Sequence, residues 1–289
     1  MYNLNMTLFD GKQEAKKLDV FIAEKVKESS SLGKLIIIQI GNNEVSEKYV
    51  ELKLKVCSRL GISADYVFLH DSMKDEEIHA SVEEIVNDES TQSAIIQLPL
   101  PRQSLKNILN IIPPDKDIDI LSSTNQFRYY SNKLCWDPLV VRALNYFLET
   151  NDIDVRNREI CIIGNGFLVG RPISHYVNLK KGIVTVIDNY VHGNFLNYQT
   201  IILSAGVCKL VNATDIVSGA VVIDFGSSML NGKVTGDLDL KSNMSHLKIV
   251  SPSPGGMGPL VIRFLILNHL RIYDIDRSTI KDISANIYE

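Results

Sequence analysis

The sequence predicts an α/β protein of two domains, and three observations carry that prediction. Short apolar runs alternate along the 289 residues with longer stretches in which apolar side chains recur at helical spacing. One apolar run in the second half leads into a glycine loop and a helix start, and the length suits two ordinary domains. We expect an N-terminal α/β domain over 1–137, a nucleotide-binding α/β domain over 138–269, and a C-terminal helix over about 270–289 that packs back on the first domain.

The composition favours a small-molecule ligand. With 45% hydrophobic and 22% charged residues the chain is typical of soluble globular proteins, and its net charge of −4 argues against nucleic acid as a partner. The four cysteines are widely spaced and form no metal-ligand pair, so we expect no metal site. No apolar run approaches the ~20 residues of a membrane span. We therefore expect a cytoplasmic protein without a membrane partner.

Periodicity places the remaining elements. A helix is expected over 11–29, a buried strand over 34–41, and a second strand over 64–70. Ser72 begins a helix that reaches about Asp88, and a short helix ends near Ile112. Residues 120–137 show no clear period and are interpreted as the crossing between domains. The second half is expected to contain a helix from Pro138 to about Thr150 and strands over 159–163, 184–188, 200–204 and 220–225.

Lys53 is the first candidate for chemistry. Tyr49, Lys53, Val56 and Leu60 share one stripe of a helix for which Ser46 is the expected N-cap and Gly61 the C-terminal stop. A lysine on an apolar stripe must snorkel, pair with an acid, or lower its pKa, and a lowered pKa makes it a proton-transfer group near neutral pH. An ordinary snorkelling lysine is the plainer alternative.

Two polar positions could join that lysine. The strand from Ala94 ends at Gln97 and is stopped by Pro99 and Pro101, and the carboxyl ends of parallel strands face the ligand crevice. Gln97 is therefore placed to act there, although a capping glutamine would look the same. The acidic run 115–119 contains Asp119, which could face the same crevice, but the run by itself is typical of a solvated loop.

The second half carries a nucleotide-binding pattern. Gly164, Gly166 and Gly170 follow a strand and precede a helix, with the spacing GxGxxxG, and the next strand ends in Asp188. Glycines let the backbone approach a pyrophosphate at a helix N-terminus, and an acid at the end of the next strand binds a ribose hydroxyl. A plain strand-to-helix turn is the alternative.

The last distinctive run is 249–259, in which prolines fix a loop and three glycines permit close backbone approach. An apolar helix over about 259–271 follows it. The loop suits a ligand-facing wall, and it would also suit a structural turn.

Five separated motifs, in order and spacing, resemble the bifunctional methylenetetrahydrofolate dehydrogenase/cyclohydrolase family. They are Tyr49-x-x-x-Lys53, Gln97-Leu98-Pro99-Leu100-Pro101, Pro114-Asp115-Lys116-Asp117-Ile118-Asp119, Val169-Gly170-Arg171-Pro172 and Pro254-Gly255-Gly256-Met257-Gly258-Pro259. The resemblance runs from Phe9 to the helix after Pro259, nearly the whole chain.

The resemblance implies a folate-binding catalytic domain, a Rossmann-type NAD(P)-binding domain, a cleft between them, and a homodimer. It makes Lys53 the catalytic lysine, Tyr49 the folate-stacking ring, Gln97 the support of the lysine, and Asp119 the pterin-binding acid. The implied activity is oxidation of methylenetetrahydrofolate to the methenyl form and hydrolysis of that form to formyltetrahydrofolate. Further contacts are implied for folate by Leu98, Pro99, Pro254, Gly255 and Gly256, and for the coenzyme by Gly164, Asn165, Gly166, Val169, Gly170, Asp188, Asn189 and Ser227.

The chain departs from the family pattern at the linker and the coenzyme side. Ile120 and Phe127 stand where the family has glycines, and Asn165 and Asp188 stand where it binds the 2′-phosphate of NADP. The family implies NADP, whereas Asp188 favours NAD. Two other functions stay open: a shikimate-type two-domain dehydrogenase, and a degenerate relative that binds folate or nucleotide without turnover.

Overall fold

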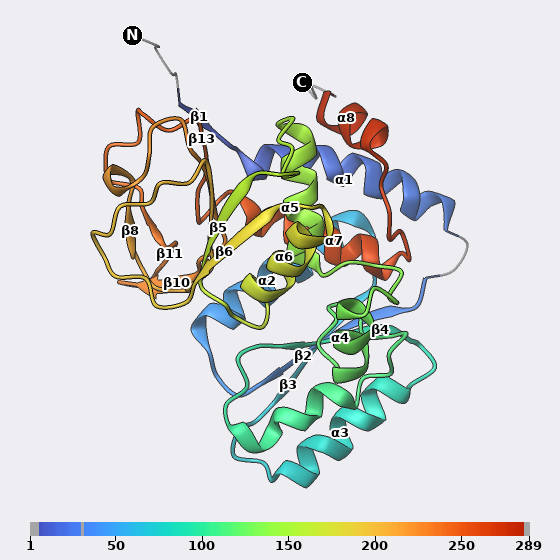
Figure 1. Ribbon diagram of the computed structural model, residues 1–289. Coiled ribbons are helices and arrows are strands. Elements are labelled where there is room, and N and C mark those ends of the chain that lie inside the picture. Colours follow the sequence, from blue (N-terminus) through green and yellow to red (C-terminus); the bar gives the residue numbers. More distant parts are fainter. Residues whose placement is uncertain (1–5, 30–31, 286–289) are drawn as a thin grey trace. The chain divides into compact units, whose positions relative to one another are not determined.

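The computed structural model describes residues 6–29 and 32–285, shown in Figure 1. Its contacts divide the chain into two compact units. One comprises Leu18–Pro138 and Ile262–Ile275, and we call it the lysine unit; the other comprises Met1–Lys17, Leu139–Val261 and Asp276–Glu289, and we call it the glycine-loop unit. The helices α1 (Gly11–Glu28) and α7 (Met257–His269) each contribute residues to both units.

The lysine unit is built on a three-stranded parallel sheet in the order β3-β2-β4. The strands are β2 (Lys34–Ile40), β3 (Ala64–Leu69) and β4 (Thr91–Gln97), which confirms the apolar runs as strands. The central strand β2 is almost wholly buried because it has a neighbour on each side and apolar side chains on both faces. The helix α3 (Asp75–Asn87) packs Ile78, Val82 and Val86 on this core.

The helix α2 (Glu44–Leu60) carries Tyr49 and Lys53, and its N-terminus differs from the sequence prediction. Asn43 is the N-cap, since its side chain accepts from the Ser46 amide at 2.9 Å. Ser46 lies inside the first turn and its hydroxyl donates to the Leu98 carbonyl oxygen at 3.0 Å. Gly61 ends the helix in the left-handed conformation, φ +74°, as expected from a C-terminal glycine.

Residues 120–137 are not a featureless crossing, which corrects the sequence prediction. They contain the helix α4 (Ser123–Tyr130), capped by Ser122, whose side chain accepts from the Asn125 amide. The helix is short and polar, so its sequence shows no apolar period, and the cap defines its start. The expected short helix before it is a 3-10 helix, η1 (Gln103–Asn110), that buries Leu105 and Ile108.

A buried ion pair connects three helices of the lysine unit. The carboxylate of Asp19 on α1 accepts two hydrogen bonds from Arg263 on α7, both at 2.9 Å, and one from Arg59 on α2 at 2.5 Å. The bidentate contact pairs the buried Arg263 guanidinium with the Asp19 carboxylate, so neither charge is buried without a partner of opposite sign.

The glycine-loop unit contains a six-stranded parallel sheet in the order β1-β13-β9-β7-β5-β6. The chain runs from β5 to β6 on one side and then crosses to β7 on the other side of β5. In open α/β sheets nucleotides bind at such a point, beyond the carboxyl ends of the strands. The strands are β1 (Thr7–Leu8), β5 (Glu159–Ile163), β6 (Ile183–Ile187), β7 (Thr200–Leu203), β9 (Val221–Asp224) and β13 (Ile249–Ser251). The helices α5 (Leu139–Thr150) and α6 (Gly170–Leu179) flank β5 in sequence.

Small elements that periodicity did not predict surround the end of this sheet. They are too short to show a period, and they are β8 (Val211–Asn212), η2 (Ala213–Asp215), β10 (Ser228–Leu230), β11 (Lys233–Thr235) and β12 (Leu238–Asp239). β10 pairs with β11 as an antiparallel hairpin, while β8 pairs in parallel with β12.

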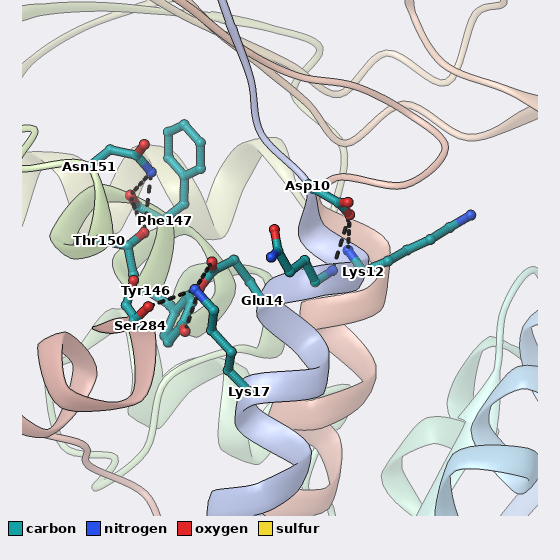
Figure 2. A network of polar contacts seen from close by, with 10 residues as sticks. Asp10, Lys12, Glu14, Lys17, Tyr146, Phe147, Thr150, Asn151 and Ser284 are labelled. Atoms are coloured by element: carbon teal, nitrogen blue, oxygen red, sulfur yellow. Dashed lines mark hydrogen bonds and ion pairs between the residues drawn. The ribbon is translucent and has the colours of Figure 1, made fainter. Parts of the chain in front are cut away.

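The C-terminal helix α8 (Arg277–Ala285) belongs to the glycine-loop unit. The sequence analysis expected it to pack on the N-terminal domain, but of residues 1–137 only the first seventeen belong to the same unit as α8. Arg277 bonds Glu149 and Asp152 at the end of α5, both at 3.0 Å. Figure 2 shows the polar contacts that join α8 to the first turns of α1: Lys17 Nζ donates to the Ser284 carbonyl oxygen at 2.6 Å and to Glu14 at 2.7 Å. The same Glu14 accepts from the Tyr146 hydroxyl at 2.9 Å, so α1, α5 and α8 form one polar network.

Candidate functional site

Lys53 and Gln97 meet in the lysine unit. Lys53 Nζ donates to Gln97 Oε1 at 2.7 Å, which joins the middle of α2 to the carboxyl end of β4. The amide of Gln97 is itself oriented, because its Nε2 donates to the Leu98 carbonyl oxygen at 2.9 Å. The oxygen that faces the lysine is therefore fixed as an acceptor.

Electrostatics couple Lys53 to Asp119. Burial lowers the pKa of Lys53, and the Asp119 carboxylate acts in the opposite direction. Burial raises the pKa of Asp119 to about 7, with Lys53 lowering it and Asp117 raising it further. Each group is thus displaced toward neutral pH, which is what acid–base chemistry requires of a proton carrier.

The loop that carries Asp119 is held by a neighbouring buried acid. Asp117 is fully buried, and its carboxylate accepts from the Leu121 amide, the Ser122 amide and hydroxyl, and Asn125 Nδ2, at 2.6 to 3.1 Å. Burial raises the pKa of Asp117, and these hydrogen bonds counteract the rise. A solvated loop is therefore the wrong description of 115–119: the loop runs beside β4, with an Ala94 amide bonded to the Lys116 carbonyl oxygen at 2.9 Å.

The departure at Ile120 has a structural explanation. Ile120 has φ +57° and is fully buried, so a branched side chain occupies a backbone conformation that glycine adopts without cost. This conformation costs roughly 1–2 kcal/mol in a residue with a Cβ. The hydrogen bonds of Asp117 to the two following amides hold the turn in place against that strain.

The other residues predicted to contact folate lie in both units. Tyr49 is half-buried one helical turn before Lys53, and Leu98 and Pro99 follow Gln97 directly. Gly255 and Gly256 lie in the glycine-loop unit, where a Cβ at Gly11 would meet the Gly256 carbonyl oxygen at 1.7 Å. The glycine at the start of α1 is thus required by its contact with the loop 251–259, and the folate role of Pro254, Gly255 and Gly256 stays a prediction.

A separate pocket lies at the glycine loop. It has a volume of about 370 Å³ and is lined at the carboxyl ends of three strands by Gly164, Asn165, Gly166, Asp188, Asn189, Tyr190, Ser204, Ala205, Val207 and Leu210. Five of the predicted coenzyme contacts line it, while Val169 and Gly170 begin α6 beside it and Ser227 follows β9.

The three glycines of the loop serve two different roles. A Cβ at Gly164 would lie 2.7 Å from the Ser204 and Ala205 backbone, and one at Gly170 would lie 2.1 Å from the Gly164 carbonyl oxygen. Both are therefore needed for packing within the protein. A Cβ at Gly166 would have no neighbour within 4 Å, so this residue leaves its backbone open to a ligand. A loop that is packed from behind and open in front fits a dinucleotide pyrophosphate.

Asp188 contributes the carboxylate of this pocket. Its Oδ1 accepts from the Asn165 amide at 3.0 Å, so the acid is attached to the glycine loop. Two basic residues outside the pocket lining are candidates to bind a phosphate there. The ring of His192 is bonded to the Leu210 carbonyl oxygen at 2.9 Å, and Lys180 lies at the C-terminal end of α6, the end away from the glycine loop. The described residues that line the pocket include no lysine or arginine. Arg171 contacts the loop from outside this lining, donating from Nε to the Asn165 carbonyl oxygen at 3.0 Å.

Comparison with known proteins assigns the family. The model of the tetrahydrofolate dehydrogenase/cyclohydrolase catalytic domain matches residues 9–119, and the model of the NAD(P)-binding domain of the same family matches residues 138–277. The chain belongs to the tetrahydrofolate dehydrogenase/cyclohydrolase family. This membership confirms the resemblance seen in the sequence, the two-domain α/β class and the nicotinamide coenzyme domain, and it does not favour the shikimate-type alternative.

Individual relatives of this family match along nearly their whole length. The chain is 30% identical over 274 residues to the bifunctional protein FolD of a Hydrogenobaculum species, covering 93% of this chain and 99% of that protein. It is 32% identical over 271 residues to the bifunctional protein FolD of Staphylococcus aureus, covering 91% and 95%. The crystal structure of the bifunctional enzyme FolD from Campylobacter jejuni superposes with a TM-score of 0.83 at 27% identity, covering 93% and 98% of the two chains.

Sequence reasoning missed the residues that hold the two sites in shape. Asp117, Ser122 and Asn125 support the loop that carries Asp119, and Asp237 accepts hydrogen bonds from three backbone amides beside the glycine-loop pocket. The alternation of acids in 115–119 was the available signal for Asp117. For Asp237, within Thr235-Gly236-Asp237, a glycine before an acid gave no sign of its distant partners.

Among the described residues, no helix has the length and apolar character needed to cross a membrane. The same residues contain no group of three or more His, Cys, Asp or Glu side chains placed to hold a metal ion.

Proposed function

We propose that this protein oxidises methylenetetrahydrofolate to methenyltetrahydrofolate with a nicotinamide coenzyme and hydrolyses the product to formyltetrahydrofolate. The observation that carries the proposal is the contact between Lys53 and an oriented Gln97, beside an acid whose pKa is raised to about 7. Family membership supplies the reaction class, and this cluster supplies the proton-transfer group that both activities need.

In the proposed mechanism Lys53 Nζ holds and moves the proton. Burial lowers its pKa, so the neutral amine becomes accessible closer to physiological pH. Gln97 accepts one N–H of Lys53 and thereby fixes where the remaining hydrogens and the lone pair point. A water that attacks the methenyl carbon can transfer a proton to this nitrogen, which then returns it as the ring opens.

Two further side chains are proposed to bind the folate. Asp119 accepts hydrogen bonds from the amino group and ring nitrogen of the pterin, and the Tyr49 ring stacks on it. Because Asp119 interacts electrostatically with Lys53, binding that stabilises its carboxylate also raises the pKa of Lys53. Substrate binding and the proton affinity of the lysine are therefore coupled.

The coenzyme, when bound, accepts the hydride of the methylene carbon. We propose that it is held by Gly164, Asn165, Gly166, Val169, Gly170, Asp188, Asn189 and Ser227. Gly166 leaves space for the pyrophosphate, and the Asp188 carboxylate accepts from a ribose hydroxyl.

We further propose NAD over NADP, in contrast to the family default. A 2′-phosphate in this pocket would lie against Asp188, and a like-charge pair at ~4 Å costs about 4 kcal/mol at an effective dielectric of ~20, reduced to ~1–2 kcal/mol by screening at an open rim. The alternative rests on Arg171, the cation that contacts the glycine loop from outside the pocket lining.

A coupled assay tests the proposal. The purified protein is given methylenetetrahydrofolate with NAD or NADP, and the absorbance of reduced nicotinamide and of the methenyl product are followed together. We expect reduced coenzyme to appear with NAD at the higher catalytic efficiency, and added methenyltetrahydrofolate to be hydrolysed without coenzyme. Folate binding without either reaction would support the degenerate relative instead.

The homodimer and the cytoplasmic location stay proposals. The outer strand β6 leaves Ile183 and Val186 exposed, and the adjacent Leu179 is also half exposed, which together offer an apolar edge to a second copy. Sedimentation of the wild type and of Ile183→Lys would test the dimer, which should dissociate in the variant.

A further inference from the structure

One carboxylate binds the loop that follows β7. Asp237 Oδ2 accepts from the Ala205 amide at 2.6 Å and the Gly206 amide at 3.2 Å, and its Oδ1 accepts from the Val207 amide at 2.8 Å. Three successive N–H groups thus converge on an acid thirty residues further along the chain. Ala205 and Val207 line the glycine-loop pocket, so this acid fixes part of the pocket wall from behind.

The arrangement needs the ionised acid. Asp237 is fully buried, and burial raises its pKa, while the three amides act in the opposite direction. A carboxylate has acceptor sites on both oxygens and can satisfy all three amides, whereas a side chain that carries a donor at one end cannot. Charge-assisted hydrogen bonds of this kind are about twice as strong as neutral ones.

The Asp237 carboxylate lies against Gly226, at a position where only glycine leaves enough space. A Cβ at Gly226 would lie 2.2 Å from Asp237 Oδ1, so any other residue there would push the acid away from the loop. A second buried acid, Asp224, lies close by: it accepts from the Gly226 amide at 2.7 Å, from the Leu238 amide at 3.0 Å and from the backbone amide of Asp237, and it accepts from none of the amides of Ala205, Gly206 and Val207. The two acids are similar in burial, and only Asp237 bonds the loop 205–207.

We propose that Asp237 is a positioning residue for the coenzyme: by binding the amides of Ala205, Gly206 and Val207 it holds the loop after β7 in the shape that lines the coenzyme pocket. This inference rests on the proposed function. It assigns Asp237 to the dehydrogenase activity alone, because ring opening by water uses no coenzyme.

The test is the variant Asp237→Asn, measured for both activities. Asparagine keeps the shape but presents an NH₂ group to amides that need an acceptor, so one side of the contact is lost. We expect KM for the coenzyme to rise by about tenfold or more, as follows from one or two lost hydrogen bonds. Dehydrogenase kcat at saturating coenzyme and the rate of ring opening should each stay within about threefold.

Asp224→Asn is the matched control, since it removes an equally buried acid that does not touch the loop. It should leave the coenzyme KM within about twofold, even where it lowers Tm as much as Asp237→Asn does. Gly226→Ala is the second test variant, because its methyl group displaces the Asp237 carboxylate without removing the charge, and it should raise the coenzyme KM in the same way.

Three results would overturn the inference: an unchanged coenzyme KM in Asp237→Asn or, if that variant does not fold, in Gly226→Ala; a parallel loss of both activities; or an equal rise of KM in Asp224→Asn. A wild-type protein that lacks both activities would instead overturn the proposed function, so the two failures are distinguishable.

Discussion

The candidate sites of the lysine unit and the glycine-loop unit consist of different kinds of chemical group. In the first, ionisable side chains lie close together, and burial displaces the pKa values of Lys53 and Asp119 toward neutral pH. In the second, the pocket is lined by two glycines, by uncharged residues and by one exposed carboxylate, that of Asp188, and the buried Asp237 contacts the pocket wall through backbone amides. Under the proposed function this difference is a division of labour, in which protons move in the lysine unit and the glycine-loop unit binds and orients the coenzyme.

Both units nevertheless shape their loops by the same device. Asp117 and Asp237 are each fully buried, and each binds the amides of neighbouring residues in a loop that carries functional groups. An acid that serves this purpose is proposed to affect function through geometry, whereas Lys53 is proposed to affect it through its proton. Variants of the two kinds should therefore have different kinetic effects.

Removing the ammonium of Lys53 should have the largest effect. Lys53→Met keeps the aliphatic stem and should reduce ring opening by about 10²–10⁴-fold, the usual contribution of a general acid or base, while folate binding changes by less than about tenfold. Stopped-flow loss of methenyl absorbance and a folate binding titration measure the two quantities. Wild-type ring opening in this variant would remove Lys53 from the mechanism and end the proposed division.

Asp119→Ala should come next, with an effect on binding. The carboxylate is proposed to accept two charge-assisted hydrogen bonds from the pterin, together worth a few kcal/mol. Folate binding should weaken by about 10²-fold and coenzyme binding should stay nearly unchanged, as measured by calorimetry with each ligand. Equal weakening of the binding of both ligands would indicate a folding defect and would contradict a role of Asp119 in folate binding alone.

Asp188→Ser tests the glycine-loop unit with a smaller effect. Removing the carboxylate should raise the ratio of NADP to NAD catalytic efficiency by about tenfold or more, since ~1–2 kcal/mol of repulsion is lost. Ring opening without coenzyme is the internal control and should not change. An unchanged ratio would mean that Asp188 does not touch the ribose. The variant Arg171→Ala would then show whether the Arg171 guanidinium binds a 2′-phosphate.

Ile120 allows a stability test of the loop held by Asp117. Ile120→Gly loses buried apolar area but relieves a strained φ, whereas Ile118→Gly, at an equally buried position without positive φ, loses area alone. The first variant should be the less destabilised by about 1 kcal/mol in urea unfolding. Equal losses of unfolding free energy would show that the turn carries no strain.

Much of this structure could be predicted from the sequence because local signals were strong. Apolar runs predicted β2, β5, β7 and β9, the glycine spacing predicted the loop between β5 and α6, and spaced motifs predicted that Lys53 and Gln97 lie together. The contacts that depend on distant partners could not be predicted. Asn43, and not Ser46, is the cap of α2, because both are residues of capping type within three positions of each other and sequence alone does not rank them. The polar helix α4 shows no apolar period.

The departures from the family pattern were visible in the sequence, but their physical meaning needed coordinates. Ile120 stands at a glycine position because the network of Asp117 supports a turn with positive φ. No sequence signal showed that Asp237 is buried, since its carboxylate is satisfied by backbone amides that any residue can supply. The alternation of acids in 115–119 did not show which of those acids is buried.

The most direct test of the central claim is the pH dependence of ring opening at saturating methenyltetrahydrofolate, compared between the wild type and Asp119→Asn. Burial lowers the pKa of Lys53 and the Asp119 carboxylate raises it, so removing that charge must lower the pKa further. We predict a wild-type profile governed by an ionisation below 10.5, the ordinary lysine pKa, and a shift of its midpoint to lower pH in Asp119→Asn. A midpoint that does not move, or the same ionisation in Lys53→Met, would contradict the assignment of Lys53 as the proton carrier.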